Sequence, residues 1–212
     1  MQSPRRYRSP AREAASNKTR ERVVAAAVRL LRSADGAQRC TLESVAKGAG
    51  VTRLTVYNLF GARSALFEAV FDERARRGGL HRIAEAMILD DPRASIAALV
   101  AIFNEFWASD RATLGNLYAL GSSDAEFAAV LRARNERRRQ AFTVLAKRLA
   151  AAGQIEPQAI DDLADVLFAL TAYAFFEDLT SRGRAPLAAL EIVRAAADDA
   201  IARAALPGRG AD

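Results

Sequence analysis

The side chains of this 212-residue chain that are best suited to chemistry lie close together in one stretch. Arg can donate two hydrogen bonds to the edge of guanine, Asn can pair with the edge of adenine, and Leu or the methyl group of Thr can contact the methyl group of thymine. We expect this set to recognise base edges in a DNA duplex. It comprises Thr52, Arg53, Leu54, Thr55 and Asn58.

A second set of polar side chains suits the DNA backbone. Hydroxyls at helix N-termini, a phenol and long cations hold phosphate oxygens but carry little information about the base. This set contains Lys18, Thr41, Tyr57 and Arg63, and we expect it to fix the register of the protein on DNA. For Tyr57 a competing interpretation is that the ring packs against the helix predicted at 19–31, which would still leave its hydroxyl able to reach a phosphate.

Charge is distributed unevenly along the chain. Residues 1–82 contain 17 Lys and Arg against 7 Asp and Glu, a net of +10, and residues 83–212 have a net of −4, which together give the formal +6. Clustered positive charge neutralises phosphates and releases their counterions, so the N-terminal part favours a polyanionic partner. For the arginines before residue 13 (Arg5, Arg6, Arg8 and Arg12), a solubilising tail is the alternative interpretation.

Helices are needed to position these side chains. Apolar residues recur at helical spacing over 19–31, and Thr41 and Thr52 are suitable N-caps for two short helices separated by Gly48-Ala49-Gly50. In the second of these helices Val56 and Phe60 share one face, which we assign to the core. The pattern predicts a helix, a tight turn and a recognition helix, followed by a fourth helix from about residue 63 to 79.

The segment Thr41–Gly61, TLESVAKGAGVTRLTVYNLFG, resembles the TetR family of transcriptional regulators. That family has a small-residue turn, then Val-Ser/Thr-Arg-x-Thr-Leu/Val-Tyr-x-x-Phe, then Lys/Arg and an Ala-Leu pair, and the match extends over about residues 17–71. Gly61-Ala62 departs from the family's usual Pro-Ser. The resemblance implies a homodimer on a palindromic operator in double-stranded DNA, most often a repressor released by a small apolar ligand.

The remainder of the chain predicts further helices and no strands, so the fold class is all-α. We expect these helices at about 80–89, 93–109, 111–121, 124–152, 157–182 and 186–206, with prolines at their starts and glycines past their ends. The expected organisation is a flexible basic arm at 1–15, a helix-turn-helix domain with its connecting helix at 16–79, a ligand-sensing and dimerisation domain at 80–206, and a tail at 207–212.

Aromatic residues of the C-terminal domain suggest a ligand site. Phe103, Phe106 and Trp107 lie at helical spacing, a stripe more typical of a core, and the resemblance implies that such helices enclose an apolar effector. Asn104, Tyr118 and Tyr173 are candidates for its polar contacts. The expected dimer interface is formed by the last two helices, through the apolar residues Leu163, Leu167, Leu170, Leu190, Val193, Ala197 and Ile201. The arginine cluster Arg134, Arg137, Arg138 and Arg139 is expected to be solvated.

Other classes of protein fit the sequence poorly. A single His and a single Cys provide neither a His-based catalytic triad nor a clustered metal site, so we expect no enzyme, no cofactor and no metal ion. The longest uncharged apolar run, 166–176, is too short to cross a bilayer, which predicts a soluble protein. No apolar segment typical of a secretory signal follows the basic N-terminus, which predicts a cytoplasmic one. A DNA-binding dimer without a small-molecule effector, architectural or controlled by a partner, remains the alternative function.

Overall fold

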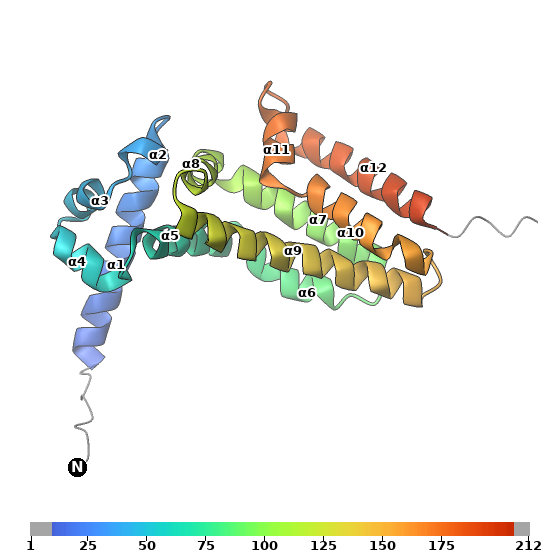
Figure 1. Cartoon of the computed structure of the whole chain (residues 1–212), viewed down its shortest axis with the longest axis horizontal. Coiled ribbons are helices and arrows are strands. Elements are labelled where there is room, and N and C mark those ends of the chain that lie inside the picture. Colours follow the sequence, from blue (N-terminus) through green and yellow to red (C-terminus); the bar gives the residue numbers. More distant parts are fainter. Residues whose placement is uncertain (1–9, 206–212) are drawn as a thin grey trace, which may run out of the picture. The chain divides into compact units, whose positions relative to one another are not determined.

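The computed structural model describes residues 10–205 and shows an all-α chain, with no strand in that range (Figure 1). Contacts divide the chain into two compact units. The N-terminal unit comprises the residues up to Glu73 together with Ala112–Val130, and the C-terminal unit comprises Arg74–Arg111 and the residues from Leu131 onward. Helices α5 (Arg63–Arg77), α8 (Arg111–Gly121) and α9 (Ala125–Ala151) each contribute residues to both units.

The N-terminal unit is built on α1 (Pro10–Leu31), which packs against α3 (Leu42–Ala49) and α4 (Arg53–Phe60). The short α2 (Gly36–Arg39) connects α1 to α3 along the chain. Its aliphatic centre is closed by the start of α5 and by α9, whose Phe67 and Phe127 rings meet edge-on with centroids 5.5 Å apart. Burial of these apolar side chains is the main source of stability for the unit. The fully buried members include Val23, Ala27, Leu31, Val45, Val56, Leu66 and Phe67.

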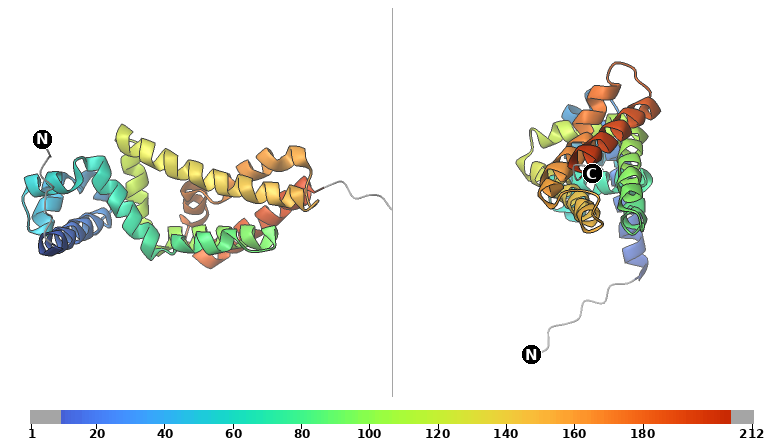
Figure 2. Two further views of the ribbon diagram at one scale, coloured as in Figure 1. Left: turned by 90° about the horizontal axis from the view of Figure 1, so that it is seen from below. Right: turned by 90° about the vertical axis from the view of Figure 1, so that its right-hand side faces the viewer.

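The C-terminal unit is a bundle in which α7 (Pro92–Ser109) and α10 (Ile160–Leu170) both pack against α12 (Pro186–Ala204) (Figure 2). Asp91 caps α7, because its carboxylate accepts hydrogen bonds from the backbone N–H groups of Arg93 and Ala94. The remaining elements of this unit are η1 (Leu80–Arg82), α6 (Ile83–Met87), η2 (Pro157–Ala159) and α11 (Tyr173–Thr180). No helix of the described part of the chain is both long and apolar enough to cross a membrane.

The N-terminal boundary differs from the predicted one. Helix α1 begins at Pro10, within the segment expected to be a flexible arm, because proline is suited to the first helical turn and the alanines that follow favour the helix. Residues 1–9 of the expected arm and the expected tail at 207–212 lie outside the described residues. Gly36, which follows the helix predicted at 19–31, begins α2, and a Cβ there would lie 2.8 Å from the Leu31 carbonyl oxygen.

The single helix predicted at 157–182 is wrong. Helix α10 ends at Leu170, Ala172 is extended (φ −71°, ψ 149°), and α11 begins at Tyr173. At the break the Thr171 carbonyl accepts hydrogen bonds from Trp107 Nε1 at 2.9 Å and from Arg138 Nη1 at 3.1 Å. Both donors come from elsewhere in the chain and are buried, so they require an acceptor that helical periodicity does not reveal.

The apolar faces predicted to form the dimer interface are buried within the single chain. Leu163, Leu167, Leu190, Val193, Ala197 and Ile201 are each at most 5% exposed. They belong to the core shared by α7, α10 and α12 and are not available to a second copy. The large apolar side chains that these helices do expose are Val166, Leu187 and Ile192.

Candidate DNA-binding site

The helix-turn-helix is fixed by two threonine caps of the same design. The backbone N–H of Ser44 donates to Thr41 Oγ1 at 3.1 Å, and that of Thr55 donates to Thr52 Oγ1 at 3.1 Å. In each pair the two hydroxyls also share a hydrogen bond of 2.9 Å. Helix α3 ends at Ala49 and is followed by its C-cap Gly50, whose φ of 64° favours glycine. Both predicted N-caps are confirmed.

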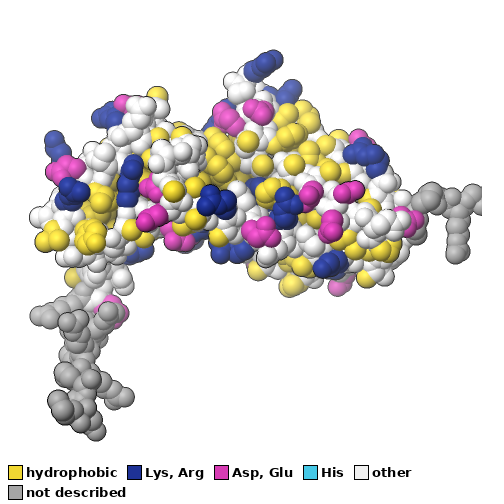
Figure 3. All heavy atoms as spheres, viewed as in Figure 1, with side chains coloured by type: hydrophobic (Ala, Val, Ile, Leu, Met, Phe, Trp, Pro, Cys, Tyr) yellow, Lys and Arg dark blue, Asp and Glu magenta, His cyan; other side chains and the backbone are white. Residues whose placement is uncertain are grey.

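Helix α4 has one buried face and one exposed face. Val56 is fully buried and Phe60 is 9% exposed, which confirms their assignment to the core. On the opposite face Leu54 is 66% exposed and Tyr57 is 57% exposed, so Tyr57 is not held in the core by its ring. Apolar side chains are visible on the surface over α4 in Figure 3.

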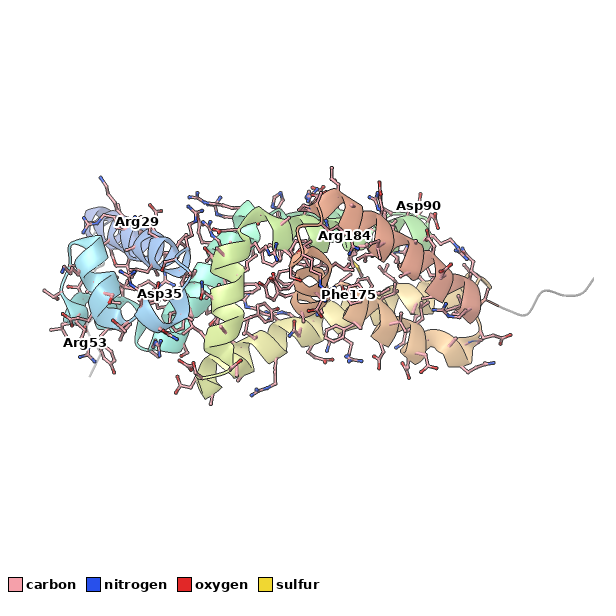
Figure 4. All side chains as sticks on the ribbon, turned by 90° about the horizontal axis from the view of Figure 1, so that it is seen from above. Arg29, Asp35, Arg53, Asp90, Phe175 and Arg184 are labelled. Carbon is pink, nitrogen blue, oxygen red and sulfur yellow. The ribbon has the colours of Figure 1, made fainter. Side chains whose placement is uncertain are left out.

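Polar members of the predicted base-contacting set share this exposed face. Arg53 and Asn58 are exposed, and the Arg53 side chain points away from the N-terminal unit (Figure 4). Thr55 is half-buried, with its hydroxyl engaged by Thr52. A short helix with an Arg, a Leu, a Tyr and an Asn directed at solvent has the donors and methyl groups that base edges and phosphates require.

The residues predicted to contact phosphates differ in the exposure and contacts of their side chains. Lys18 on α1 and Thr41 at the start of α3 are exposed. Arg63 is half-buried: its Nη2 lies 3.5 Å from the Cys40 carbonyl oxygen, and its guanidinium lies 4.9 Å from the centroid of the Phe67 ring. The structure therefore gives Arg63 a role in packing α5 against the turn before α3, alongside the phosphate contact expected from its charge.

Three arginines of α1, which the sequence analysis did not single out, hold the ends of the helix-turn-helix. Arg22 Nη2 donates to the Ala49 carbonyl at 3.1 Å and Arg29 Nη2 to the Gly48 carbonyl at 2.9 Å. Arg20 Nη1 donates to the Leu59 carbonyl at 3.2 Å, and its guanidinium lies 4.3 Å from the Phe60 centroid. Cations stabilise the carbonyl ends of helices, so part of the N-terminal charge stabilises α3 and α4.

Asn116 of α8 makes a further contact that sequence reasoning missed. Its Nδ2 donates to the Leu31 and Ser33 carbonyls at 2.8 and 3.0 Å, and its Oδ1 accepts from the Ala37 N–H at 3.0 Å. The side chain thus satisfies backbone groups at the turn between α1 and α2. Helix α8 is consequently tied to the N-terminal unit by directional bonds as well as by packing.

Four residues predicted for the ligand site form an aromatic cluster in the C-terminal unit. The Trp107 ring lies 4.6 Å from Phe106, 6.4 Å from Phe103 and 5.5 Å from Tyr173, measured between centroids. Asn104 is buried, and its Nδ2 donates to the Pro186 carbonyl at 3.1 Å, at the start of α12. Tyr118 lies in the part of α8 that belongs to the N-terminal unit.

Charged groups surround the Tyr173 end of this aromatic cluster. The Tyr173 hydroxyl donates to Glu177 Oε2 at 3.1 Å, and Arg111 holds the same carboxylate through Nε at 2.8 Å and Nη2 at 2.7 Å. The hydrogen bond from Arg111 lowers the pKa of Glu177, and the Glu177 carboxylate raises the pKa of Arg111. A two-point contact of this kind fixes orientation as well as distance.

Arg138 corrects the expectation of a solvated arginine face on α9. It is 6% exposed, and its guanidinium lies 5.5 Å from the Phe103 centroid and 4.5 Å from the Phe168 centroid. The neighbouring Arg139 forms an ion pair with Asp165 of α10. Arg138 and Arg139 therefore join α9 to α7 and α10. Of the four arginines in the cluster, only Arg137 is exposed.

One family model matches the part of the chain that contains the helix-turn-helix. Residues 23–70 match the family model for bacterial regulatory proteins of the tetR family. That match covers α3, α4 and most of α5, which confirms the resemblance drawn from the motif. A search of curated proteins finds no match to the chain.

Solved structures resemble the chain over nearly its whole length. A protein of Syntrophomonas wolfei assigned to the TetR family of transcriptional regulators has a TM-score of 0.73 at 12% identity, over 88% of this chain and 96% of that one. NalD of Pseudomonas aeruginosa, the secondary repressor of the MexAB-OprM multidrug efflux pump, has a TM-score of 0.66 at 20% identity, over 91% and 99%. A protein of Saccharomonospora viridis assigned as a transcriptional regulator, in complex with choline, has a TM-score of 0.65 at 17% identity, over 88% and 96%.

These findings define a class of protein. The chain has the fold of TetR-family transcriptional regulators, with the helix-turn-helix of that family at its N-terminus. The family model matches only the N-terminal part of the chain, whereas the likeness of fold extends over most of its length.

Proposed function

We propose that the chain is a dimeric, sequence-specific DNA-binding repressor that a small apolar ligand releases from its operator. The observation that carries the proposal is the division of α4 into a buried anchor, Val56 and Phe60, and an exposed face with Leu54 and Tyr57. Large apolar side chains that lie exposed on a short capped helix favour an intermolecular contact over a structural role. Together with Arg53 and Asn58 they suit the major groove.

Contacts with DNA divide into two groups in this proposal. Thr52, Arg53, Leu54, Thr55 and Asn58 select the base sequence, and Lys18, Thr41, Tyr57 and Arg63 hold phosphates. The exposed N-termini of α3 and α4, each capped by a threonine hydroxyl, support backbone contacts at both helices. A dimer places two such sets on half-sites about 34–36 Å apart, which requires a palindromic operator.

Dimerisation is proposed through the exposed sides of α10 and α12. Val166 of α10 and Leu187 and Ile192 of α12 are 38%, 74% and 40% exposed. Their counterparts on the opposite sides of the same helices are buried in the core, so these helices carry apolar side chains on more than one face. Covering the outer residues with a symmetry-related copy would complete a four-helix interface.

The aromatic cluster of Phe103, Phe106, Trp107 and Tyr173 is the proposed effector site. NalD is a repressor, and the Saccharomonospora viridis protein binds choline, which supports a small-molecule effector. One observation favours the second candidate function, a DNA-binding dimer without an effector: the Asn104 amide and the Trp107 indole already donate to backbone carbonyls, as in a core. A ligand that binds only the folded chain at about 100 times its dissociation constant adds about 2.7 kcal/mol of stability, so a thermal-shift screen of apolar compounds distinguishes the two.

DNA binding itself is tested by selecting duplexes from a random library with the full chain. Enrichment of a common sequence, followed by loss of binding in Arg53→Ala and retained binding in the control Arg132→Ala, supports the proposal. Arg132 suits the control because it is also exposed but lies on α9 in the C-terminal unit. Equal binding by both variants would contradict the assignment of α4 as the recognition helix.

A further inference from the structure

Two adjacent residues at the junction of α7 and α8 hold different parts of the C-terminal unit. Asp110 Oδ2 accepts a hydrogen bond of 2.8 Å from Arg74 Nη1 of α5, and both side chains are less than 10% exposed. Arg111, the next residue, donates two hydrogen bonds to the carboxylate of Glu177 in α11. A displacement of this junction would therefore displace both α5 and α11.

The contacts continue from α11 to the aromatic cluster. Glu177 Oε2 accepts from the Tyr173 hydroxyl at 3.1 Å, and the Tyr173 ring stands edge-on to Trp107 at 5.5 Å. We call Tyr173, Glu177, Arg111, Asp110 and Arg74 the junction network. Each hydrogen bond within it has ordinary geometry, and one end of it lies beside the proposed effector site.

The other end of the junction network lies on helices that run on into the DNA-binding unit. Arg74 follows Glu73, the last α5 residue of the N-terminal unit, and Arg111 precedes Ala112, the first α8 residue of that unit. Helix α8 then presents Asn116, which binds backbone groups of Leu31 and Ala37. The junction network thus acts at the points where both helices leave the C-terminal unit.

We propose that the junction network is the coupling element through which the aromatic cluster and the DNA-binding unit influence each other. The inference rests on the function proposed above. Arg74 and Asp110 form a buried ion pair, and breaking such a pair is costly, so these side chains move together. The paired contact between Arg111 and Glu177 transmits rotation as well as translation of α11, because two parallel hydrogen bonds fix orientation.

Coupling between two sites is reciprocal, which allows a test without a known effector. Trp107 is the single tryptophan of the chain, so its fluorescence reports on the aromatic cluster alone. The probe is a duplex that the full chain has selected from a random library. Saturating the protein with this duplex should shift the Trp107 emission.

The half-exposed members of the junction network are the residues to substitute, because Asp110→Asn would remove the charge beside a buried guanidinium. We expect Glu177→Gln and Arg111→Gln to bind the duplex within about threefold of the unaltered chain, as surface changes do, while the DNA-induced shift is lost. The matched control is Glu105→Gln, which removes the exposed ion pair between α7 and Arg82. This variant should retain the full shift.

Three outcomes of this experiment would refute the junction network, and a fourth would refute the proposed function. An undiminished shift in both Glu177→Gln and Arg111→Gln overturns the junction network, and so does a silent Trp107 in an unaltered chain that binds DNA. A shift lost equally in Glu105→Gln also overturns it, because the effect would then not depend on the network. Failure to select or bind any duplex overturns the proposed function itself.

Discussion

Replacing Arg53 with Ala separates DNA recognition from folding. Arg53 is exposed and begins α4 after the Thr52 cap, whose hydrogen bond comes from Thr55. Its loss should therefore change the free energy of unfolding by no more than about 0.5 kcal/mol. A bidentate contact between Arg and a base contributes about 1–3 kcal/mol of discrimination, and a dimer makes the contact in both half-sites. The expected loss of operator binding is about 2–6 kcal/mol, or at least roughly thirtyfold.

The assay is fluorescence anisotropy of a labelled duplex carrying the selected operator. A second duplex has the contacted base pair changed in both half-sites. The unaltered chain should prefer the first duplex, and Arg53→Ala should bind both equally. Arg63→Ala is the comparison: it should weaken both duplexes alike and reduce the salt slope by about one for each phosphate contact removed. Unchanged affinity and unchanged base preference in Arg53→Ala would refute the assigned role.

Three further outcomes follow from the structure. If the dimer makes about eight phosphate contacts, a plot of log affinity against log salt concentration should have a slope of about −7. A slope near zero would contradict binding to the DNA backbone. Arg111 lowers the pKa of Glu177, so the stabilising effect of the ionised Glu177 is complete above the ordinary carboxylate pKa and is lost as pH falls through the lowered value. The difference in melting temperature between the unaltered chain and Glu177→Gln should therefore shrink at low pH. A difference that stays constant with pH would argue against the ion pair. Burial raises the pKa of Cys40 to about 12, so iodoacetamide should modify this thiol only after unfolding, and rapid labelling of the native chain would contradict its burial.

Local patterns in the sequence were sufficient to predict the helix-turn-helix. Thr41 and Thr52 act as caps through neighbours three residues away, and Val56 and Phe60 share a face because of helical periodicity. Both are properties of short segments, which explains why they were predicted correctly. The exposure of Leu54 and Tyr57 follows from the same periodicity.

Features that depend on distant partners could not be predicted in this way. The break at Thr171 exists where Trp107 and Arg138 supply donors to one carbonyl, and neither residue is near it in sequence. Arg138 belonged to a run of arginines typical of a solvated face, yet it is buried beside Phe103 and Phe168. Alanine-rich and aliphatic faces on α10 and α12 were predicted for a dimer interface, but the same composition also suits a core.

The most direct test of the central claim is the selection of duplexes from a random library by the full chain, followed by sequencing. The proposed function predicts enrichment of a two-fold symmetric sequence whose half-site centres lie about 10–10.5 base pairs apart, or a multiple of that spacing. It also predicts that Arg53→Ala no longer enriches that sequence, while the Arg132→Ala control still does. A library that stays unenriched, or enrichment unaffected by Arg53→Ala, would contradict the claim that α4 recognises DNA.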